Sequence, residues 1–131
     1  MNLNQVTVPA LDVAASVAFY RTLGLVQIVD APHYARFECP EGDSTFSVHR
    51  TELAAKPGLV IYFEVEDLDR RCRELAAAGI VFDQEPQDEP WLWREARLRD
   101  PSGNIICLYW AGENRKNPPW RIAPDAIPGV A

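Results

Sequence analysis

The sequence has little of what metal-binding, membrane-spanning and secreted proteins need. It contains one methionine, two histidines and three cysteines, and Cys39, Cys72 and Cys107 form no C-x-x-C pair. An odd number of scattered cysteines fits reduced thiols better than a disulfide framework or a zinc site. No apolar run approaches the roughly 20 residues that cross a bilayer, and the N-terminus lacks a basic start with a long apolar stretch. We therefore expect a cytoplasmic protein without a membrane anchor.

Clusters of positive charge are also missing. Nineteen acidic residues outnumber thirteen Lys and Arg residues, the formal net charge is −6, and the densest basic group is Arg70, Arg71 and Arg73. Binding to a phosphate backbone requires clustered positive charge, so we expect no nucleic-acid partner. The 131 residues, of which 47% are hydrophobic, suffice for one domain with a core but not for two of ordinary size.

The chain alternates β-favouring runs with two amphipathic stretches. Strands are expected at 3–9, 25–29, 33–39 and 44–50, around a helix that follows Asp12 and ends at Gly24. The same order returns further along, with strands at 59–65, 80–82, 91–99 and 104–110 around a helix between Asp67 and Gly79.

The turn and cap residues of the two halves keep a constant spacing. Asp67 and Gly79 each stand 55 residues after Asp12 and Gly24 (67 − 12 and 79 − 24). The P-x-G hairpin at 40–42 returns 61 residues later at 101–103 (101 − 40 and 103 − 42). Neither half is large enough to bury its own sheet face, so the halves should pair.

This repeat predicts an α+β fold of two tandem βαβββ modules, residues 1–52 and 57–110, within one domain (1–110). The modules should form a curved eight-stranded mixed sheet with the helices outside. Residues 111–131 contain four of the eleven prolines and show no strand or helix period. We expect this tail to pack on the domain, on a partner subunit or over a cavity mouth.

Three segments resemble a known family: LDVAASVAFYRTLGL at 11–25, FEVEDLD at 63–69 and RDPSGNIICLY at 99–109. The chain is similar in these segments to the vicinal oxygen chelate superfamily, which includes glyoxalases, bleomycin resistance proteins and dioxygenases. The resemblance implies a funnel-shaped cavity for a small molecule and a homodimer of chains that associate side by side.

The same resemblance implies four metal-ligand positions, and they fall on Gln5, Ser47, Val60 and Cys107. Valine has no donor atom, and a thiol replaces the carboxylate that the family motif carries. Such a set does not offset the dehydration of a divalent ion, so we expect no metal or other cofactor there. Neither histidine, His33 or His49, falls on a ligand position, which excludes a two-histidine, one-carboxylate centre.

Candidate ligand-binding residues follow from strand alternation and from the resemblance. Alternation places Ser47 and His49 on one face of the strand at 44–50. It likewise places Trp93, Glu95 and Arg97 together on one face of the strand at 91–99. His49 is either an acid–base group or a strand-end histidine, and Cys107 is either a cavity thiol or a small buried residue. Glu95 either pairs with an arginine or contacts a ligand, and Tyr62 either bonds in the cavity or anchors the core. The candidates are Gln5, Ser47, His49, Tyr62, Trp93, Glu95, Cys107 and Tyr109.

Two functions from different classes remain open, besides a domain that only associates with another protein. The first is a metal-independent protein that binds a small, partly aromatic or amphipathic molecule in the cavity. The second is a glyoxalase-like lyase or isomerase, or a related dioxygenase-type enzyme. This enzyme would keep Gln5 and hold a metal at a shifted site through Ser47, His49 or Glu95.

Overall fold

The computed structural model describes residues 1–123 and contains the predicted repeat of two βαβββ modules. The first module consists of β1 (Gln5–Ala10), α1 (Val13–Thr22), β2 (Val26–Ala31), β3 (Tyr34–Glu38) and β4 (Thr45–Arg50). The second consists of β5 (Val60–Glu64), α2 (Leu68–Ala77), β6 (Phe82–Asp88), β7 (Arg94–Arg99) and β8 (Ile105–Trp110). A short 3-10 helix, η1 (Gly112–Arg115), follows β8.

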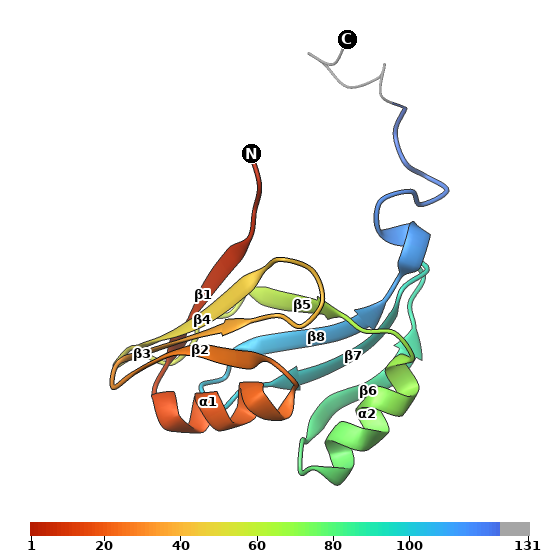
Figure 1. Cartoon of the computed structure of the whole chain (residues 1–131). Helices are drawn as coiled ribbons and strands as arrows, with labels where there is room; N and C mark the ends of the chain where they lie inside the picture. The colour runs from red at the N-terminus through yellow and green to blue at the C-terminus, as the bar shows by residue number, and fades with distance from the viewer. Residues whose placement is uncertain (124–131) are drawn as a thin grey trace.

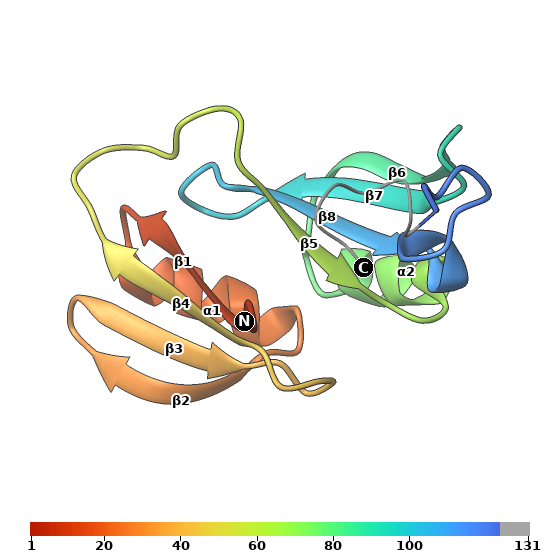
Figure 2. The same ribbon diagram turned by 90° about the horizontal axis from the view of Figure 1, so that it is seen from above.

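The eight strands hydrogen-bond as two four-stranded mixed sheets, one in each module. Sheet A has the order β1-β4-β3-β2 and sheet B the order β5-β8-β7-β6, with the first pair of each sheet parallel and the other pairs antiparallel. The modules lie side by side (Figure 2). The predicted α+β class and the curved eight-stranded arrangement are confirmed, although the ladder of hydrogen bonds does not run from one sheet into the other.

Strand β6 differs from the prediction. A strand was expected at 80–82, whereas the observed strand runs through Phe82–Asp88, with the sequence FDQEPQD. A search for apolar runs misses this strand, because most of its side chains are polar and it contains Pro86. These residues are tolerated because β6 is the outer strand of sheet B, where one side of its backbone needs no partner strand. Its pairing with β7 is irregular, with register shifts on both sides of Gln84.

Strand β7 begins three residues later than the expected 91–99. The chain turns at Pro90–Leu92, and Leu92 adopts a left-handed backbone conformation with φ 68°. The backbone N–H of Glu89 donates to the carbonyl of Trp93 at 2.8 Å, which closes the turn. The turn places the side chains of Trp91 and Trp93 beside the sheet.

One face of each sheet packs on the helices and the other face is open. Both helices lie on the same side of the molecule, and the faces that the sheets turn away from them lie on the opposite side (Figure 1). Alternate strand residues form the buried core with the helices, including Val8, Phe37, Phe46, Ile61, Leu98 and Ile106. No helix among residues 1–123 has the length and apolarity required to span a membrane.

The helix ends have the predicted chemistry. The side chains of Asp12 and Asp67 cap α1 and α2 by accepting from backbone N–H groups three residues on. Gly24 and Gly79 follow the helices with φ 103° and 98°. At Gly24 there is a second requirement, since a Cβ atom there would lie 2.9 Å from the guanidinium of Arg71.

The turn between β7 and β8 is organised by the buried carboxylate of Asp100. Its Oδ1 accepts from the backbone N–H groups of Ser102 and Asn104, both at 2.9 Å. Its Oδ2 accepts from the Asn104 amide at 2.7 Å and from the hydroxyl of Tyr20 in α1 at 2.6 Å. Burial and the carboxylate raise the pKa of Tyr20 far above its ordinary value. This turn of module 2 therefore holds a core residue of module 1.

Further bonds join the modules on the helix side. The Asn104 amide donates to the carbonyl of Pro9 at 2.9 Å, and the Ser102 hydroxyl accepts from the N–H of Leu11 at 2.8 Å. Arg71 of α2 donates to the carbonyl of Leu23 at the end of α1, also at 2.9 Å. Both the β7–β8 turn and helix α2 of the second module therefore hydrogen-bond to the first module.

Candidate functional site

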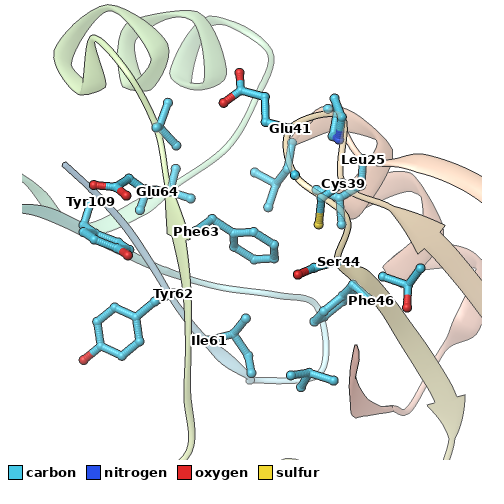
Figure 3. Close-up of a pocket in the computed structure, with 18 of the residues that line it drawn as sticks. Leu25, Cys39, Glu41, Ser44, Phe46, Ile61, Tyr62, Phe63, Glu64 and Tyr109 are labelled. Atoms are coloured by element: carbon cyan, nitrogen blue, oxygen red, sulfur yellow. The ribbon is translucent and has the colours of Figure 1, made fainter. Parts of the chain in front are cut away.

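A cavity of about 730 Å³ lies between the modules, beside the edge strands β1 and β5. We call it the inter-module cavity. Its wall includes Leu25, Cys39 and Phe46 from module 1 and Ile61 and Phe63 from module 2 (Figure 3). The Phe46 and Phe63 rings meet edge to face at 5.8 Å. A volume of this order accommodates a small organic molecule, for which roughly 300–1,000 Å³ is usual.

The cavity continues around strand β5 to the open face of sheet B. Successive strand residues point to opposite faces, and Tyr62 lies across β5 from Phe63 (Figure 3). Tyr62 and Tyr109 nevertheless line the same cavity as Phe63. A molecule in the cavity therefore meets apolar side chains on one side of β5 and phenol rings on the other.

Tyr62, Trp93 and Tyr109 form an aromatic cluster on the open face of sheet B. The Trp93 and Tyr109 rings are stacked, with centroids 4.4 Å apart and an angle of 15° between the planes. Tyr62 stands nearly perpendicular to both, at 6.0 Å from Trp93 and 5.8 Å from Tyr109. Tyr109 is 6% exposed and Tyr62 is 46% exposed, so the cluster has a fixed base and a free edge.

Glu95 lies on the same open face as a buried, paired carboxylate. It is 2% exposed. Its Oε1 accepts from Arg97 Nη2 at 3.1 Å, and its Oε2 accepts from the indole N–H of Trp91. The thiol of Cys107 lies 3.5 Å from Oε1. Of the two interpretations of Glu95, the structure contains the ion pair with Arg97, and the carboxylate is left without a free direction toward solvent.

Cys107 is a buried thiol without the environment of a nucleophile. Burial, followed by the charge of Glu95, raises its pKa to about 12. A thiolate is the reactive form of cysteine, and it is therefore scarce at neutral pH. This environment agrees with the interpretation of Cys107 as a small buried residue.

The open face of sheet A is polar, and we call its members Gln5, Thr7, Tyr34, Arg36, Ser47 and His49 the polar face. The hydroxyls of Thr7 and Ser47 are 2.6 Å apart, and Thr45 donates to Gln5 Oε1 at 2.8 Å. Arg36 Nε donates to the hydroxyl of Tyr34 at 2.9 Å. The nearby hydroxyl of Ser47, and then the guanidinium of Arg36, lower the pKa of Tyr34. His49 is exposed near the end of β4 and its ring lies 6.0 Å from that of His33.

The four positions that the resemblance assigns to metal ligands are divided between the two sheets. Gln5 and Ser47 lie on sheet A, whereas Val60 of β5 pairs with Ile105 and Cys107 of β8 pairs with Tyr62 on sheet B. Val60 has no donor atom, Ser47 is engaged with Thr7, and Cys107 is fully buried. Among residues 1–123, no three His, Cys, Asp or Glu side chains gather in a way that would hold a metal ion.

The structure divides the sequence candidates between the two open faces. Gln5, Ser47 and His49 lie on sheet A, and the other five lie on sheet B; Gln5, Tyr62 and Tyr109 line the inter-module cavity. The sequence reasoning missed Tyr34, Arg36 and Trp91. Tyr34 and Arg36 could have been identified from the sequence, because a hairpin between 33–39 and 44–50 pairs Tyr34 with His49 and Arg36 with Ser47. Trp91 could not have been identified in this way, because it contacts Glu95 from a turn outside the strand.

The start of the tail is fixed to sheet B by Glu64. Its Oε2 accepts from the backbone N–H groups of Ala111 and Gly112 at 2.9 and 3.0 Å, and the indole of Trp93 donates to the carbonyl of Asn114 at 3.3 Å. Trp120 is 57% exposed. Residues 124–131 of the tail lie outside the described residues, and docking of the tail on another surface stays a prediction.

The fold therefore consists of two linked βαβββ modules, each with an open sheet face, and a cavity between them. The chain belongs to the Glyoxalase/Bleomycin resistance protein/Dioxygenase superfamily, whose family model matches residues 2–108. The predicted resemblance is thereby confirmed.

Individual relatives agree with this assignment. The chain is 29% identical over 125 residues to the uncharacterized protein YraH of Bacillus subtilis (strain 168), covering 83% of this chain and 98% of that protein. A glyoxalase/bleomycin resistance protein/dioxygenase from Nocardioides has a similar structure, with a TM-score of 0.74, 23% identity and coverage of 94% and 90%. A bleomycin-binding protein in complex with bleomycin has a TM-score of 0.67, with 20% identity and coverage of 84% and 98%. At these identities the two structures show a shared fold.

Proposed function

We propose that the protein binds a small, partly aromatic or amphipathic organic molecule in the inter-module cavity, without a metal ion. The observation that carries this proposal is the continuity of the cavity with the aromatic cluster around β5. Phe46 and Phe63 offer apolar contact on one side, and the half-exposed ring of Tyr62 offers a stacking or edge contact on the other.

The donor chemistry supports binding without a metal. The family ligand positions hold an amide, a hydroxyl, a valine and a buried thiol whose pKa is raised to about 12. None of these supplies a carboxylate or an imidazole, the ligands that bind divalent ions most readily at neutral pH. The fold neighbour in complex with bleomycin illustrates that this scaffold holds an organic molecule.

Tryptophan fluorescence tests the proposal, since Trp110 lines the cavity and Trp93 belongs to the aromatic cluster. Protein dialysed against EDTA is titrated with a panel of naphthalene, indole and quinoline derivatives and with bleomycin. We expect saturable quenching by at least one compound, and about tenfold weaker binding in Tyr62→Ala, because a stacked aromatic contact contributes about 0.5–1.5 kcal/mol beyond its buried area.

The control variant is Trp120→Ala, which removes an exposed aromatic side chain from the tail. It should bind as the native chain does. No saturable quenching by any compound, or equal weakening in both variants, would count against the proposal. Stoichiometric nickel, zinc, manganese or iron that survives dialysis would instead favour the metal-dependent enzyme.

We further propose that the protein is a homodimer, as the family resemblance implies, and that it is cytoplasmic. The edge strand β2 exposes two apolar side chains, Val26 and Ile28, and an apolar edge of this kind favours association. The three cysteines are free, which suits a reducing compartment. Sedimentation equilibrium should give twice the chain mass, and Val26→Lys with Ile28→Lys should shift the equilibrium toward monomer.

A further inference from the structure

We infer that the open face of sheet A contains an anion-binding site, centred on Arg36 and Tyr34, that takes the carboxylate of a small organic acid. The inference goes beyond the proposed function and does not depend on it. The site lies on strands β3 and β4, whereas the aromatic cluster belongs to sheet B.

The first support is the unmatched charge of Arg36. Four arginines among residues 1–123 are half-buried, and three of them pair with a carboxylate: Arg71 with Glu74 at 3.3 Å, Arg94 with Asp69 at 2.9 Å and Arg97 with Glu95 at 3.1 Å. Arg36 is the fourth, and no carboxylate of the described residues lies within 4.0 Å of it. A partly desolvated guanidinium without an anion is unfavourable, and an acidic ligand would supply the partner.

The second support is the orientation of the guanidinium. Arg36 Nε donates to the hydroxyl of Tyr34 at 2.9 Å, and the guanidinium carbon lies 5.5 Å from the centre of the Tyr34 ring. These contacts fix the planar group while its two terminal nitrogens make no hydrogen bond to the described residues. Two parallel N–H groups in one plane match the two oxygens of a carboxylate.

The third support is the set of neighbours across the ladder. Arg36 lies opposite Ser47, and Tyr34 lies opposite His49. The hydroxyls of Tyr34 and Ser47 and the imidazole of His49 therefore belong to the same part of the face, and each can donate to an anionic oxygen. Glu38, the acidic residue on the same strand, is exposed at the strand end. By strand alternation Glu38 shares the face of Arg36, but among the described residues its carboxylate makes no ion pair with the guanidinium.

Nuclear magnetic resonance of the full chain tests the inference with two probes of equal shape, benzoate and benzamide. Benzoate should shift the Nε–Hε signal of Arg36 saturably, and benzamide should bind about tenfold more weakly because it lacks the charge. Equal affinity for the two probes, or no shift with benzoate, would overturn the inference.

Two variants assign the effect to the residue. Arg36→Gln should weaken benzoate binding about tenfold or more, and Arg36→Lys should fall between, because the charge remains without the planar fork. Arg73→Gln, which neutralises an exposed arginine of α2, should change nothing. A native backbone spectrum in Arg36→Gln shows that the fold is intact. Native-like benzoate affinity in that variant would contradict the site.

Discussion

Glu95 shows how a charged side chain on the open face of sheet B is paired with its neighbours. Its buried carboxylate receives one guanidinium, one indole and one thiol, from Arg97, Trp91 and Cys107. The site therefore combines a neutralised charge with the rings of the aromatic cluster. Such a surface suits a molecule with a flat apolar part better than one with a strong charge of its own.

Replacing Glu95 by Gln should destabilise the protein, because Arg97 loses the charge that compensates its partial burial. We expect a loss of about 1–3 kcal/mol in the free energy of unfolding, measured by urea denaturation. Glu85→Gln, a change at an exposed position of β6, is the control and should cost less than about 0.5 kcal/mol. Equal stability of the Glu95→Gln and native proteins would show that the ion pair contributes nothing.

The buried phenol of Tyr20 should make stability fall at alkaline pH. The pKa of Tyr20 is raised in the folded protein from 10.0, so the unfolded chain loses this proton first. The contribution is complete below about pH 10 and declines above it, because ionisation then favours the unfolded state. Urea denaturation at pH 8 to 11 should show a weaker decline in Tyr20→Phe than in the native chain. Parallel declines would contradict the assignment.

The cysteines should resist alkylation in the folded state. Burial raises the pKa of Cys72 to about 11 and that of Cys107 to about 12, and it also raises the pKa of the half-buried Cys39. Iodoacetamide at pH 8 should modify Cys39 first and the other two only after denaturant is added. Mass spectrometry of peptides reads the order. Rapid labelling of Cys107 in the native protein would point to a reactive thiol.

At the scale of elements, the Asp-Pro-x-Gly-Asn turn joins the modules as well as two strands. Asn104→Ala should cost about 1–3 kcal/mol, because the carbonyl of Pro9 and the carboxylate of Asp100 each lose a buried donor. The matched control is Asp43→Ala, at the equivalent place of the first-half turn, which is exposed. It should change stability by less than about 0.5 kcal/mol. Thermal unfolding of both variants shows whether the second turn contributes to stability and the first turn does not.

The elements also show what the sequence predicts and why the rest escapes it. Both helices, both caps and seven strands follow from apolar spacing and from Asp12, Gly24, Asp67 and Gly79, since these signals are local. Strand β6 escapes because an edge strand tolerates polar residues and Pro86. The polar face escapes in part because the pairing of Arg36 depends on which charges approach from elsewhere in the chain, which spacing alone does not specify.

At the scale of the whole molecule, Glu64 ties the end of β8 and the start of the tail to sheet B. A chain that ends at Lys116 should keep the melting temperature of the full chain, because the bonds to Ala111, Gly112 and Asn114 remain. A chain that ends at Trp110 should melt about 5 °C lower or more. Calorimetry compares the three chains. A native melting temperature for the shorter chain would show that the anchor does not stabilise the domain.

The central claim is that a small organic molecule binds between the modules without a metal. A crystal structure of the EDTA-dialysed protein, soaked with the tightest compound of the fluorescence panel, tests it most directly. The account predicts density for the compound in the inter-module cavity, in contact with Phe63 and reaching Tyr62 around the edge of strand β5, with no anomalous scattering from a metal. Density for the compound on a metal ion held by Gln5, Ser47, His49 or Glu95 would contradict the account.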